Sequence, residues 1–379
     1  MSNPRINILT PIPFWHPGTV EFINLLKDQG YKVVALDIWD YYYYDENGVS
    51  YYLCPKFLKG IFLRVYRKLN RKRILRKYIQ KADVIDIQWC GYYYAEYIDY
   101  IFKLNEKIIA TPFGSDVLRA NDNERKIQNH IFEKSKLIVL GKNWHDVFLK
   151  FFPHTESKLR FSQFGSARFD RIVELYSESF KLSLRLKYKV PDDKICVTVG
   201  YSASPVQQHL VFLEQIKKCK GEIASKVIFL FPLTYGIEKE SEYYKKLISE
   251  IKSSGFDYLL FENRLSDDEL SEIRILSDVM VNIQTTDSQA SSIKEAFAAR
   301  NVVLVGDWLP YDFYEDLGVY LIRSDLENLN SNFVKIIEEY NTCKNLTFSN
   351  MDVVSIFASW KQIIPKFINV YKEVNYGRY

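Results

Sequence analysis

The sequence predicts an α/β protein made of two doubly wound, Rossmann-like domains that face a cleft. The chain has 379 residues, which is roughly two to three times the length of a typical domain. Short apolar segments alternate with helical ones along both halves, as in parallel sheets covered on both faces. Hydrophobic residues make up 47% and charged residues 26% of the chain, which excludes a disordered or fibrous protein.

The first half contains five short apolar segments that we expect to be strands. A helix is expected over residues 19–29, where apolar side chains recur with helical spacing and Gly30 follows as the terminator. The remaining segments are each preceded by helical or charged sequence. The expected strands are residues 5–10, 32–38, 84–88, 107–111 and 136–140.

The second half repeats the pattern, with strands expected at residues 195–200, 226–232, 258–262, 279–284 and 301–306. Helices are expected at residues 206–219, 240–253, 267–276 and 291–299. A polar, charged stretch at 170–194 separates the halves, so we expect domains at 1–170 and 171–352. The tail is amphipathic, with Pro365 expected to kink it. Residues 353–379 are expected to form a helix that packs back on the first domain.

Positive charge is concentrated in one part of the chain. The formal net charge is only +4, too small to indicate nucleic-acid binding. Between Asn47 and Ala82, however, there are eleven Lys and Arg residues and no Asp or Glu. Such a stretch is often a solvated helix face, but its apolar stripe predicts peripheral contact with an anionic membrane. The stripe is expected to contain Leu58, Phe62, Val65, Leu69, Leu75 and Tyr78.

Several common classes are excluded by missing motifs. No apolar run approaches the roughly 18 residues that span a bilayer, and the start has no secretory character. The five Cys are widely spaced, which favours a reducing, cytoplasmic location. Dinucleotide-binding, P-loop, α/β-hydrolase and zinc patterns are all absent. A nucleotide diphosphate held by helix N-termini and carboxylates remains compatible with two such domains.

Residues 279–305 resemble the carboxyl-terminal signature of GT-B glycosyltransferases, especially family 4. The signature contains two acids separated by seven residues, here Asp287 and Glu295, at the entry to a helix. The first acid is Asp where the family usually has Glu. Other similar pieces follow the family order: residues 111–116 (TPFGSD), 160–165 (RFSQFG) and 260–270 (LFENRLSDDEL). The resemblance covers most of the chain.

One departure from family 4 concerns the phosphate-binding loop. Residues 200–209 (GYSASPVQQH) lack the Arg and Lys that the family usually offers to the pyrophosphate. Together with residues 231–236 (FPLTYG), this loop is more similar to bacterial transferases that move 4-acetamido-4,6-dideoxygalactose. That resemblance implies that Ser202, Ser204 and the following helix N-terminus hold phosphate oxygens.

The resemblance implies a glycosyltransferase that moves a sugar from a nucleotide-diphosphate sugar to a glycan or lipid-linked acceptor in bacterial surface polysaccharide synthesis. Neither a cofactor nor a metal is required, because helix N-termini neutralise the leaving diphosphate, and no nucleic-acid partner is expected. Asp116 is the candidate general base and His16 the second candidate. The implied donor-binding residues are Ser202, Ser204, His209, Tyr235, Asn263, Arg264, Leu265, Asp287, Ser288, Gln289, Ser291, Ser292 and Glu295.

Each candidate also has a structural interpretation. Asp287 can be a loop charge at a helix start, and Glu295 can form a capping box with Ser292. Asp116 can cap the helix that follows it, and His209 can be a surface residue. Ser202 and Ser204 can be loop or cap residues. Two other functions stay open: a nucleotide-sugar 2-epimerase of the same fold and a non-catalytic glycan-binding protein.

Overall fold

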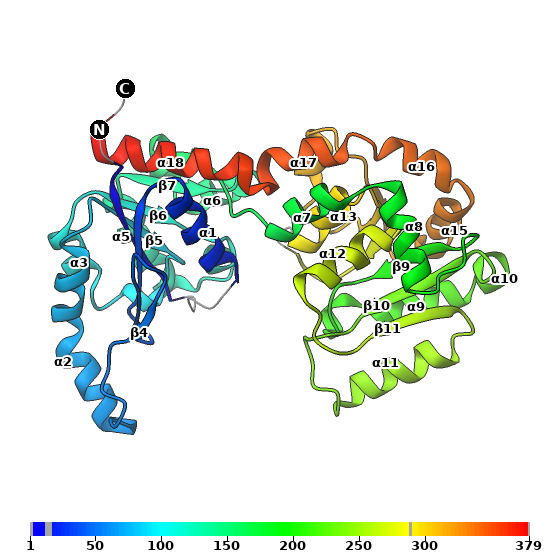
Figure 1. Cartoon of the computed structure of the whole chain (residues 1–379), viewed down its shortest axis with the longest axis horizontal. Coiled ribbons are helices and arrows are strands. Elements are labelled where there is room, and N and C mark those ends of the chain that lie inside the picture. Colours follow the sequence, from blue (N-terminus) through cyan, green and yellow to red (C-terminus); the bar gives the residue numbers. More distant parts are fainter. Residues whose placement is uncertain (1–2, 12–16, 288–289, 378–379) are drawn as a thin grey trace. The chain divides into compact units, whose positions relative to one another are not determined.

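The chain forms two compact α/β units (Figure 1), and the prediction of two Rossmann-like domains is confirmed. A computed structural model describes residues 3–11, 17–287 and 290–377. The first unit contains Met1–Gly165 together with Trp360–Tyr379, and the second contains Ser166–Ser359. Within the described residues, no helix is both long and apolar enough to cross a membrane.

The first unit is built on an eight-stranded sheet in the order β4-β3-β2-β1-β5-β6-β7-β8. Six strands are parallel, and β3 and β4 add an antiparallel hairpin at one edge. The predicted strands correspond to β1, β2, β5, β6 and β7, and β8 overlaps residues 160–165, where the family resemblance implies a strand and a turn; the hairpin was not predicted. The strands are β1 (Arg5–Leu9), β2 (Lys32–Asp37), β3 (Tyr42–Tyr44), β4 (Ser50–Tyr52), β5 (Val84–Gln88), β6 (Ile108–Thr111), β7 (Leu137–Leu140) and β8 (Leu159–Phe161).

Helices cover both faces of this sheet and bury it in two apolar clusters. One cluster includes side chains of α2, α3, α5 and α6, and the other includes side chains of α1 and α18. On α18, the Tyr371 hydroxyl donates to Asp86 of β5 (2.8 Å). The helices are α1 (Pro17–Asp28), α2 (Gly60–Ile79), α3 (Ile98–Leu104), α4 (Ser115–Leu118), α5 (Asp122–Lys134), α6 (His145–Phe151) and α18 (Trp360–Tyr376).

The second unit has a six-stranded, wholly parallel sheet in the order β11-β10-β9-β12-β13-β14. Its strands are β9 (Ile195–Val199), β10 (Val227–Pro232), β11 (Asp257–Phe261), β12 (Val279–Asn282), β13 (Val302–Gly306) and β14 (Ile322–Ser324). Its helices are α7 (Ala167–Leu175), α8 (Glu178–Lys187), α9 (His209–Lys217), α10 (Lys220–Ile223), α11 (Glu242–Ser253), α12 (Asp267–Leu276), α13 (Ser291–Ala298), α14 (Asp312–Asp316), α15 (Leu329–Glu338), α16 (Tyr340–Leu346) and α17 (Asn350–Ala358).

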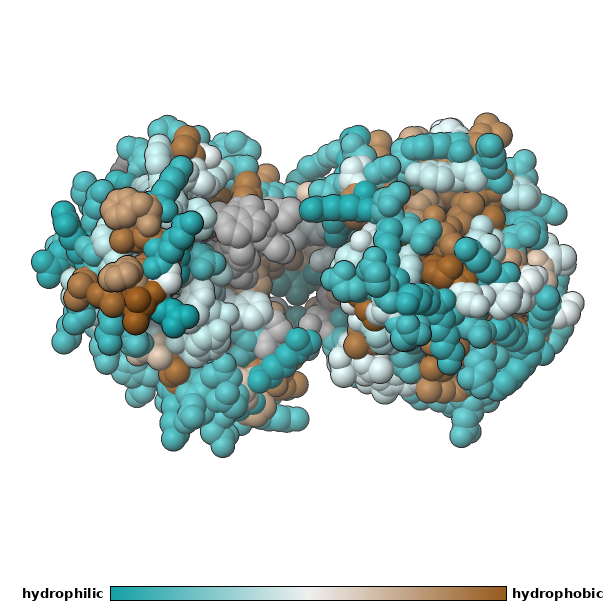
Figure 2. Space-filling view, turned by 90° about the horizontal axis from the view of Figure 1, so that it is seen from below, coloured by the Kyte–Doolittle hydropathy of each residue, from teal (hydrophilic) through white to brown (hydrophobic). Residues whose placement is uncertain are grey.

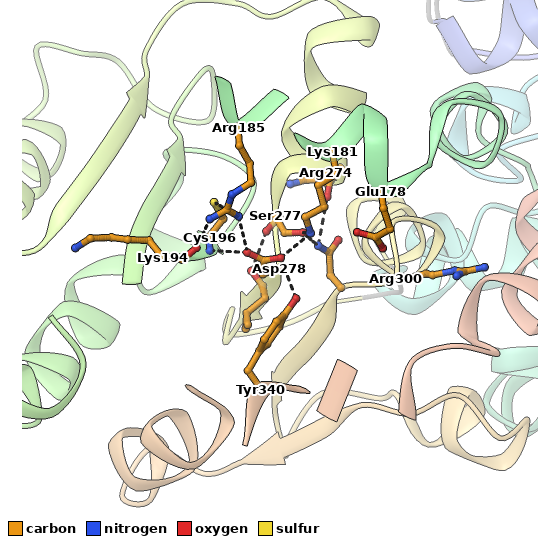
Figure 3. A network of polar contacts seen from close by, with 12 residues as sticks. Glu178, Lys181, Arg185, Lys194, Cys196, Arg274, Ser277, Asp278, Arg300 and Tyr340 are labelled. Carbon is orange, nitrogen blue, oxygen red and sulfur yellow. Dashed lines mark hydrogen bonds and ion pairs between the residues drawn. The ribbon is translucent and has the colours of Figure 1, made fainter. Parts of the chain in front are cut away.

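The polar stretch at 170–194 contains the end of α7 and the whole of α8, and two charges of α8 belong to a buried network (Figure 3). Lys181 and Arg185 of α8 pair with the buried carboxylate of Asp278, at 2.6 and 3.3 Å. Tyr340 of α16 also donates to it (2.9 Å). Burial raises the pKa of Asp278, but the charge and hydrogen bond of Lys181, together with the Cys196 N–H and the charge of Lys344, hold the pKa below its usual value. This network fixes α8 to the amino end of β12.

Candidate functional site

Two glycines bring the loops after β9 and β10 together at the carboxyl edge of the second sheet. Gly200 has φ +64°, and a Cβ there would lie 2.8 Å from His209 Nε2. Gly236 has φ +105°, and a Cβ there would lie 2.9 Å from the backbone nitrogen of Ser204. The Ala203 N–H donates across the two loops to the Tyr235 carbonyl (2.7 Å). Both positions require glycine, because each has a positive φ and because a Cβ would come too close to an atom of the neighbouring loop.

The loop after β9 is also fixed to the loop after β12. The Gln284 side-chain oxygen accepts from the Tyr201 hydroxyl and from Gln207 Nε2, each at 3.0 Å. In the same loop, Ser202 is buried and its hydroxyl accepts the Ser204 N–H (3.4 Å). Ser204 precedes the short 3-10 helix η4 (Pro205–Gln207) without capping it through its side chain. Both serines therefore lie in a loop that is held in place at its two ends.

His209 is the first residue of α9 and is completely buried, so the surface interpretation is wrong. Burial lowers the pKa of its imidazole to about 4, with a small opposing effect of the Val199 backbone. The ring is therefore neutral at physiological pH. Neither ring nitrogen makes a geometrically good hydrogen bond within the described residues.

Asp287 fixes the segment that leads into α13. Its carboxylate accepts the Ala290 N–H at 3.1 and 3.2 Å, and it also accepts a hydrogen bond from the Tyr311 hydroxyl. Tyr311 in turn accepts from the Asn282 side chain (2.8 Å). The carboxylate is thus positioned at the amino end of a buried helix, where negative charge is favourable.

Glu295 forms a buried ion-pair cluster, and the capping-box interpretation is wrong. Its side chain is 2% exposed. Arg168 Nε lies 2.8 Å from one carboxylate oxygen, and Arg274 Nε lies 3.4 Å from the other. The N-cap of α13 is Ala290, which has no side-chain cap, and the Ser292 hydroxyl is buried without a partner in the described residues. The carboxylate therefore joins α7, α12 and α13.

Two buried cations near this cluster have unused donors. Arg274 is 3% exposed, and its Nη1 has no hydrogen-bond partner within the described residues. Lys294 is 7% exposed and forms no ion pair or hydrogen bond in the same part of the chain. Burial lowers the pKa of Lys294 to about 8, against the opposing charges of Glu295 and Asp287. Excess donors on buried cations favour an anionic ligand.

Arg274 also lies near the loops at the carboxyl edge of the sheet. Burial raises the pKa of Tyr201, and the Arg274 charge is near enough to oppose that rise. Burial also raises the pKa of Tyr235, and the charges of Arg274 and Arg168 oppose that rise. The sequence analysis missed Arg274, Lys294 and Arg168. A signal was present in two cases, because charged residues stand between apolar neighbours in IRI (273–275) and IKEAF (293–297).

The other predicted donor residues lie at the ends of the strands or outside the described residues. Asn263 and Arg264 are exposed in the loop after β11, whereas Leu265 is half-buried against the core. Tyr235 is exposed after β10, and Ser291 is exposed at the start of α13. Three predicted residues fall outside the described ranges: His16, Ser288 and Gln289.

Asp116 lies in α4 of the first unit and binds two loops through its carboxylate. One oxygen accepts the Phe113 N–H (2.9 Å), and the other accepts the Cys90 N–H (2.8 Å). Burial raises its pKa to about 6, although the two N–H groups oppose the rise. The carboxylate therefore joins the loops that follow β5 and β6, and it titrates near neutral pH.

We expect Asp116→Asn to change how stability depends on pH. The folded protein holds a proton on Asp116 at a pH where the unfolded chain has lost it, so stability falls as the pH rises from 3.8 to about 6. An asparagine side chain cannot titrate, so the free energy of unfolding of the variant should not show this fall between pH 3.8 and about 6. Urea unfolding of both proteins across this range checks the prediction. Parallel stability curves would show that the pKa of Asp116 is not raised.

Comparisons with known proteins give a consistent fold. No family model and no curated protein matches the chain. A glycosyltransferase from Rickettsia africae ESF-5 is similar over 100% of both chains, with 16% identity and a TM-score of 0.74. Anabaena Alr3699/HepE in complex with UDP and glucose has 12% identity and a TM-score of 0.69, over 98% of this chain and 100% of HepE.

A third similar structure is WaaG, a glycosyltransferase involved in lipopolysaccharide biosynthesis. It has 12% identity and a TM-score of 0.63, over 97% of this chain and 99% of WaaG. The chain therefore has the GT-B fold that its sequence signature implied. Within the described residues, no group of three or more His, Cys, Asp or Glu side chains is arranged to hold a metal ion.

Proposed function

We propose that the chain is a glycosyltransferase that uses a nucleotide-diphosphate sugar as donor. The observation that carries the proposal is the cluster around Glu295, where the buried cations Arg274 and Lys294 have donors without a partner among the described residues. Arg274 also lies near Tyr201 at the carboxyl edge of the parallel sheet. Ligands of such sheets bind at this edge. HepE, which shares the fold, was crystallised with UDP and with UDP-glucose, which supports the same class of donor here.

In this proposal Arg274 and Lys294 supply the positive charge that the loop after β9 lacks. The diphosphate carries the negative charge that develops on the leaving group, and hydrogen bonds between charged partners are about twice as strong as neutral ones. The loop of Ser202 and Ser204 and the start of α9 add hydroxyl and backbone donors. Asp287 is the proposed contact to the donor sugar and Glu295 the proposed contact to the ribose, and the UDP affinity of Glu295→Gln, described in the Discussion, tests the second of these roles.

The proposed acceptor is a glycan or lipid-linked glycan of a bacterial surface polysaccharide, such as a capsule or O-antigen. The role of WaaG in lipopolysaccharide biosynthesis supports this choice, which would place the chain in the cytoplasm at the inner face of the plasma membrane. Asp116 is the proposed general base for the acceptor hydroxyl, because a pKa of about 6 suits proton transfer near neutral pH.

Release of nucleoside diphosphate from a panel of nucleotide sugars tests this function, with and without lipid-linked glycans extracted from bacterial membranes. The proposal requires sugar to appear on the acceptor and release to depend on it. Epimerised sugar or nucleotide release without acceptor would instead show the 2-epimerase. Glycan binding without any saturable nucleotide affinity would show a binding protein.

Lys294→Met tests the proposed diphosphate contact. Methionine has a similar length but no charge, so affinity for a nucleoside diphosphate should fall about 10- to 100-fold, the value of a charge-assisted hydrogen bond. Apo stability should hold or rise, because an unpaired buried ammonium is lost. Wild-type affinity should also weaken as the pH rises through about 8, where Lys294 loses its proton.

Calorimetric titrations of both proteins with UDP and with uridine check this prediction. Uridine has no phosphate, so its affinity should be the same in both. The exposed Lys252→Met is the matched control and should leave both affinities unchanged. Equal UDP affinity in Lys294→Met and wild type would remove Lys294 from the site without contradicting nucleotide binding.

A further inference from the structure

The amino-terminal half of α2 and the turn before it expose a group of large apolar side chains. In Figure 1 this helix extends downward from the first unit, and Figure 2 views the chain from below, with brown side chains among teal ones on that unit. Soluble proteins rarely expose a cluster of large apolar side chains unless the cluster binds a partner. The exposed side chains are Phe57 (82%), Ile61 (70%), Phe62 (72%), Val65 (51%) and Leu69 (75%).

The exposed residues of α2 share one side of the helix. At 3.6 residues per turn, Ile61, Phe62, Val65 and Leu69 fall within an arc of about 100°. This stripe differs from the expected one, because Leu75 is buried and Tyr78 stacks on Tyr43 (ring centroids 4.1 Å apart). The apolar side chains of the carboxyl-terminal half therefore pack on the first unit, and the exposed large apolar side chains of this stretch are confined to residues 57–69.

The basic residues of the same stretch fall into two groups. Three arginines bind within the first unit: Arg67 donates to the Trp39 carbonyl, Arg71 to the Tyr41 hydroxyl and Arg76 to the Tyr100 hydroxyl. The second group has no ion pair or hydrogen bond with any described residue and is exposed. It contains Lys56, Lys59, Arg64, Lys68, Arg73 and Lys81, together with Lys72 and Lys77, whose ammonium groups lie over the rings of Tyr100 and Tyr78.

The free cations lie beside the apolar stripe. At 100° per residue, Lys68 and Arg64 lie about 20° and 60° beyond the edge of the stripe that Ile61 forms, so they border it along α2. Asn47 to Ala82 contains no Asp or Glu to neutralise them. An apolar strip bordered by unpaired cations is complementary to a surface with an apolar interior and anionic headgroups.

We propose that residues 56–73 form a docking surface for an anionic lipid bilayer. Phe57, Ile61, Phe62, Val65 and Leu69 would enter the interface between headgroups and acyl chains, and the free cations would bind the headgroups. The proposal deepens the proposed function, since a lipid-linked acceptor is met at a membrane. It rests on the surface of α2 and does not depend on the donor site.

Co-sedimentation with vesicles tests this surface, using phosphatidylglycerol mixed with phosphatidylcholine against phosphatidylcholine alone. Wild-type protein should bind the anionic vesicles at low salt and lose affinity as salt is raised. The double variant Phe62→Ser with Leu69→Ser should bind at least about tenfold more weakly. Arg64→Glu with Lys68→Glu should have an effect of similar size, because each cation near the surface contributes to the attraction.

Matched controls carry the same changes on the second unit. Phe348→Ser with Leu186→Ser removes side chains that are 65% and 80% exposed, and Lys218→Glu with Lys252→Glu makes the same change in net charge. Both controls should bind vesicles like wild type. Thermal unfolding and UDP binding should be unchanged in all four variants, which separates this surface from the donor site.

Three results would overturn the proposal. Wild-type protein that stays in the supernatant at low salt would show that α2 does not bind membranes. If the control variants lose as much affinity for anionic vesicles as the α2 variants do, the attraction is not specific to α2. A concentration-dependent dimer that is abolished by Phe62→Ser with Leu69→Ser would show that a second copy of the chain covers the stripe.

Discussion

Glu295→Gln should lower the free energy of unfolding by about 3–5 kcal/mol, the usual cost of breaking a buried ion pair by removing one partner. The carboxylate lies between Arg168 and Arg274, and glutamine would turn an amide donor toward one guanidinium. Arg274, only 3% exposed, would keep a buried charge without compensation. Urea denaturation of the ligand-free protein measures the loss.

Glu269→Gln is the matched control, because Glu269 caps α12 at the surface and glutamine caps nearly as well. Adding Arg274→Met to Glu295→Gln should recover part of the loss, since no unpaired guanidinium remains. Unchanged stability in Glu295→Gln, with UDP affinity about 10- to 100-fold weaker, would contradict the ion-pair account. That result would favour ribose binding as the main role of the carboxylate.

Asp278→Asn should lower the free energy of unfolding by a similar amount, about 3–5 kcal/mol. Lys181 and Arg185 are both buried and have Asp278 as their shared counter-charge, so the substitution leaves two cations without it. The pKa of Asp278 is lowered in the folded protein, so this stabilisation is present above pH 3.8 and is lost as the pH falls through the lower folded pKa. Urea unfolding of the variant near pH 7 measures the loss.

The exposed Asp268→Asn removes a surface ion pair with Arg171 and should change stability little. Because the Asp278 network lies at the amino end of β12, UDP affinity should be the same in wild type and Asp278→Asn under conditions where both are folded. If Asp278→Asn and Asp268→Asn have the same free energy of unfolding, the network shown in Figure 3 does not stabilise α8.

The central strands were predictable because each is a buried apolar run between helical segments. The edge elements were not, since β3 (YYY) and β4 (SYY) are short tyrosine-rich strands without a burial pattern. The helices within the polar stretch at 170–194 were not predicted, because a sequence does not show which charges become paired. Lys181 and Arg185 acquire their partner, Asp278, only when α8 packs against the sheet.

The candidate site was predictable where local sequence fixes local geometry. Asp287 and Glu295 were singled out because residues 279–305 resemble the GT-B signature, and the structure places Asp287 just before α13 and Glu295 within it. Their partners come from distant segments: Tyr311 for Asp287, and Arg168 and Arg274 for Glu295. A single sequence cannot show such pairings, so the ion pairs of Glu295 with two arginines were not predicted and a capping box was considered instead.

Isothermal titration of the wild-type protein with nucleoside diphosphates tests the central claim most directly. UDP, GDP, ADP and CDP are compared with their monophosphates and nucleosides, because the proposed contacts of Arg274 and Lys294 are made with the diphosphate. The account predicts saturable binding of at least one diphosphate, tighter than its monophosphate by about tenfold or more. No saturable binding of any diphosphate would contradict a nucleotide-sugar donor at this site.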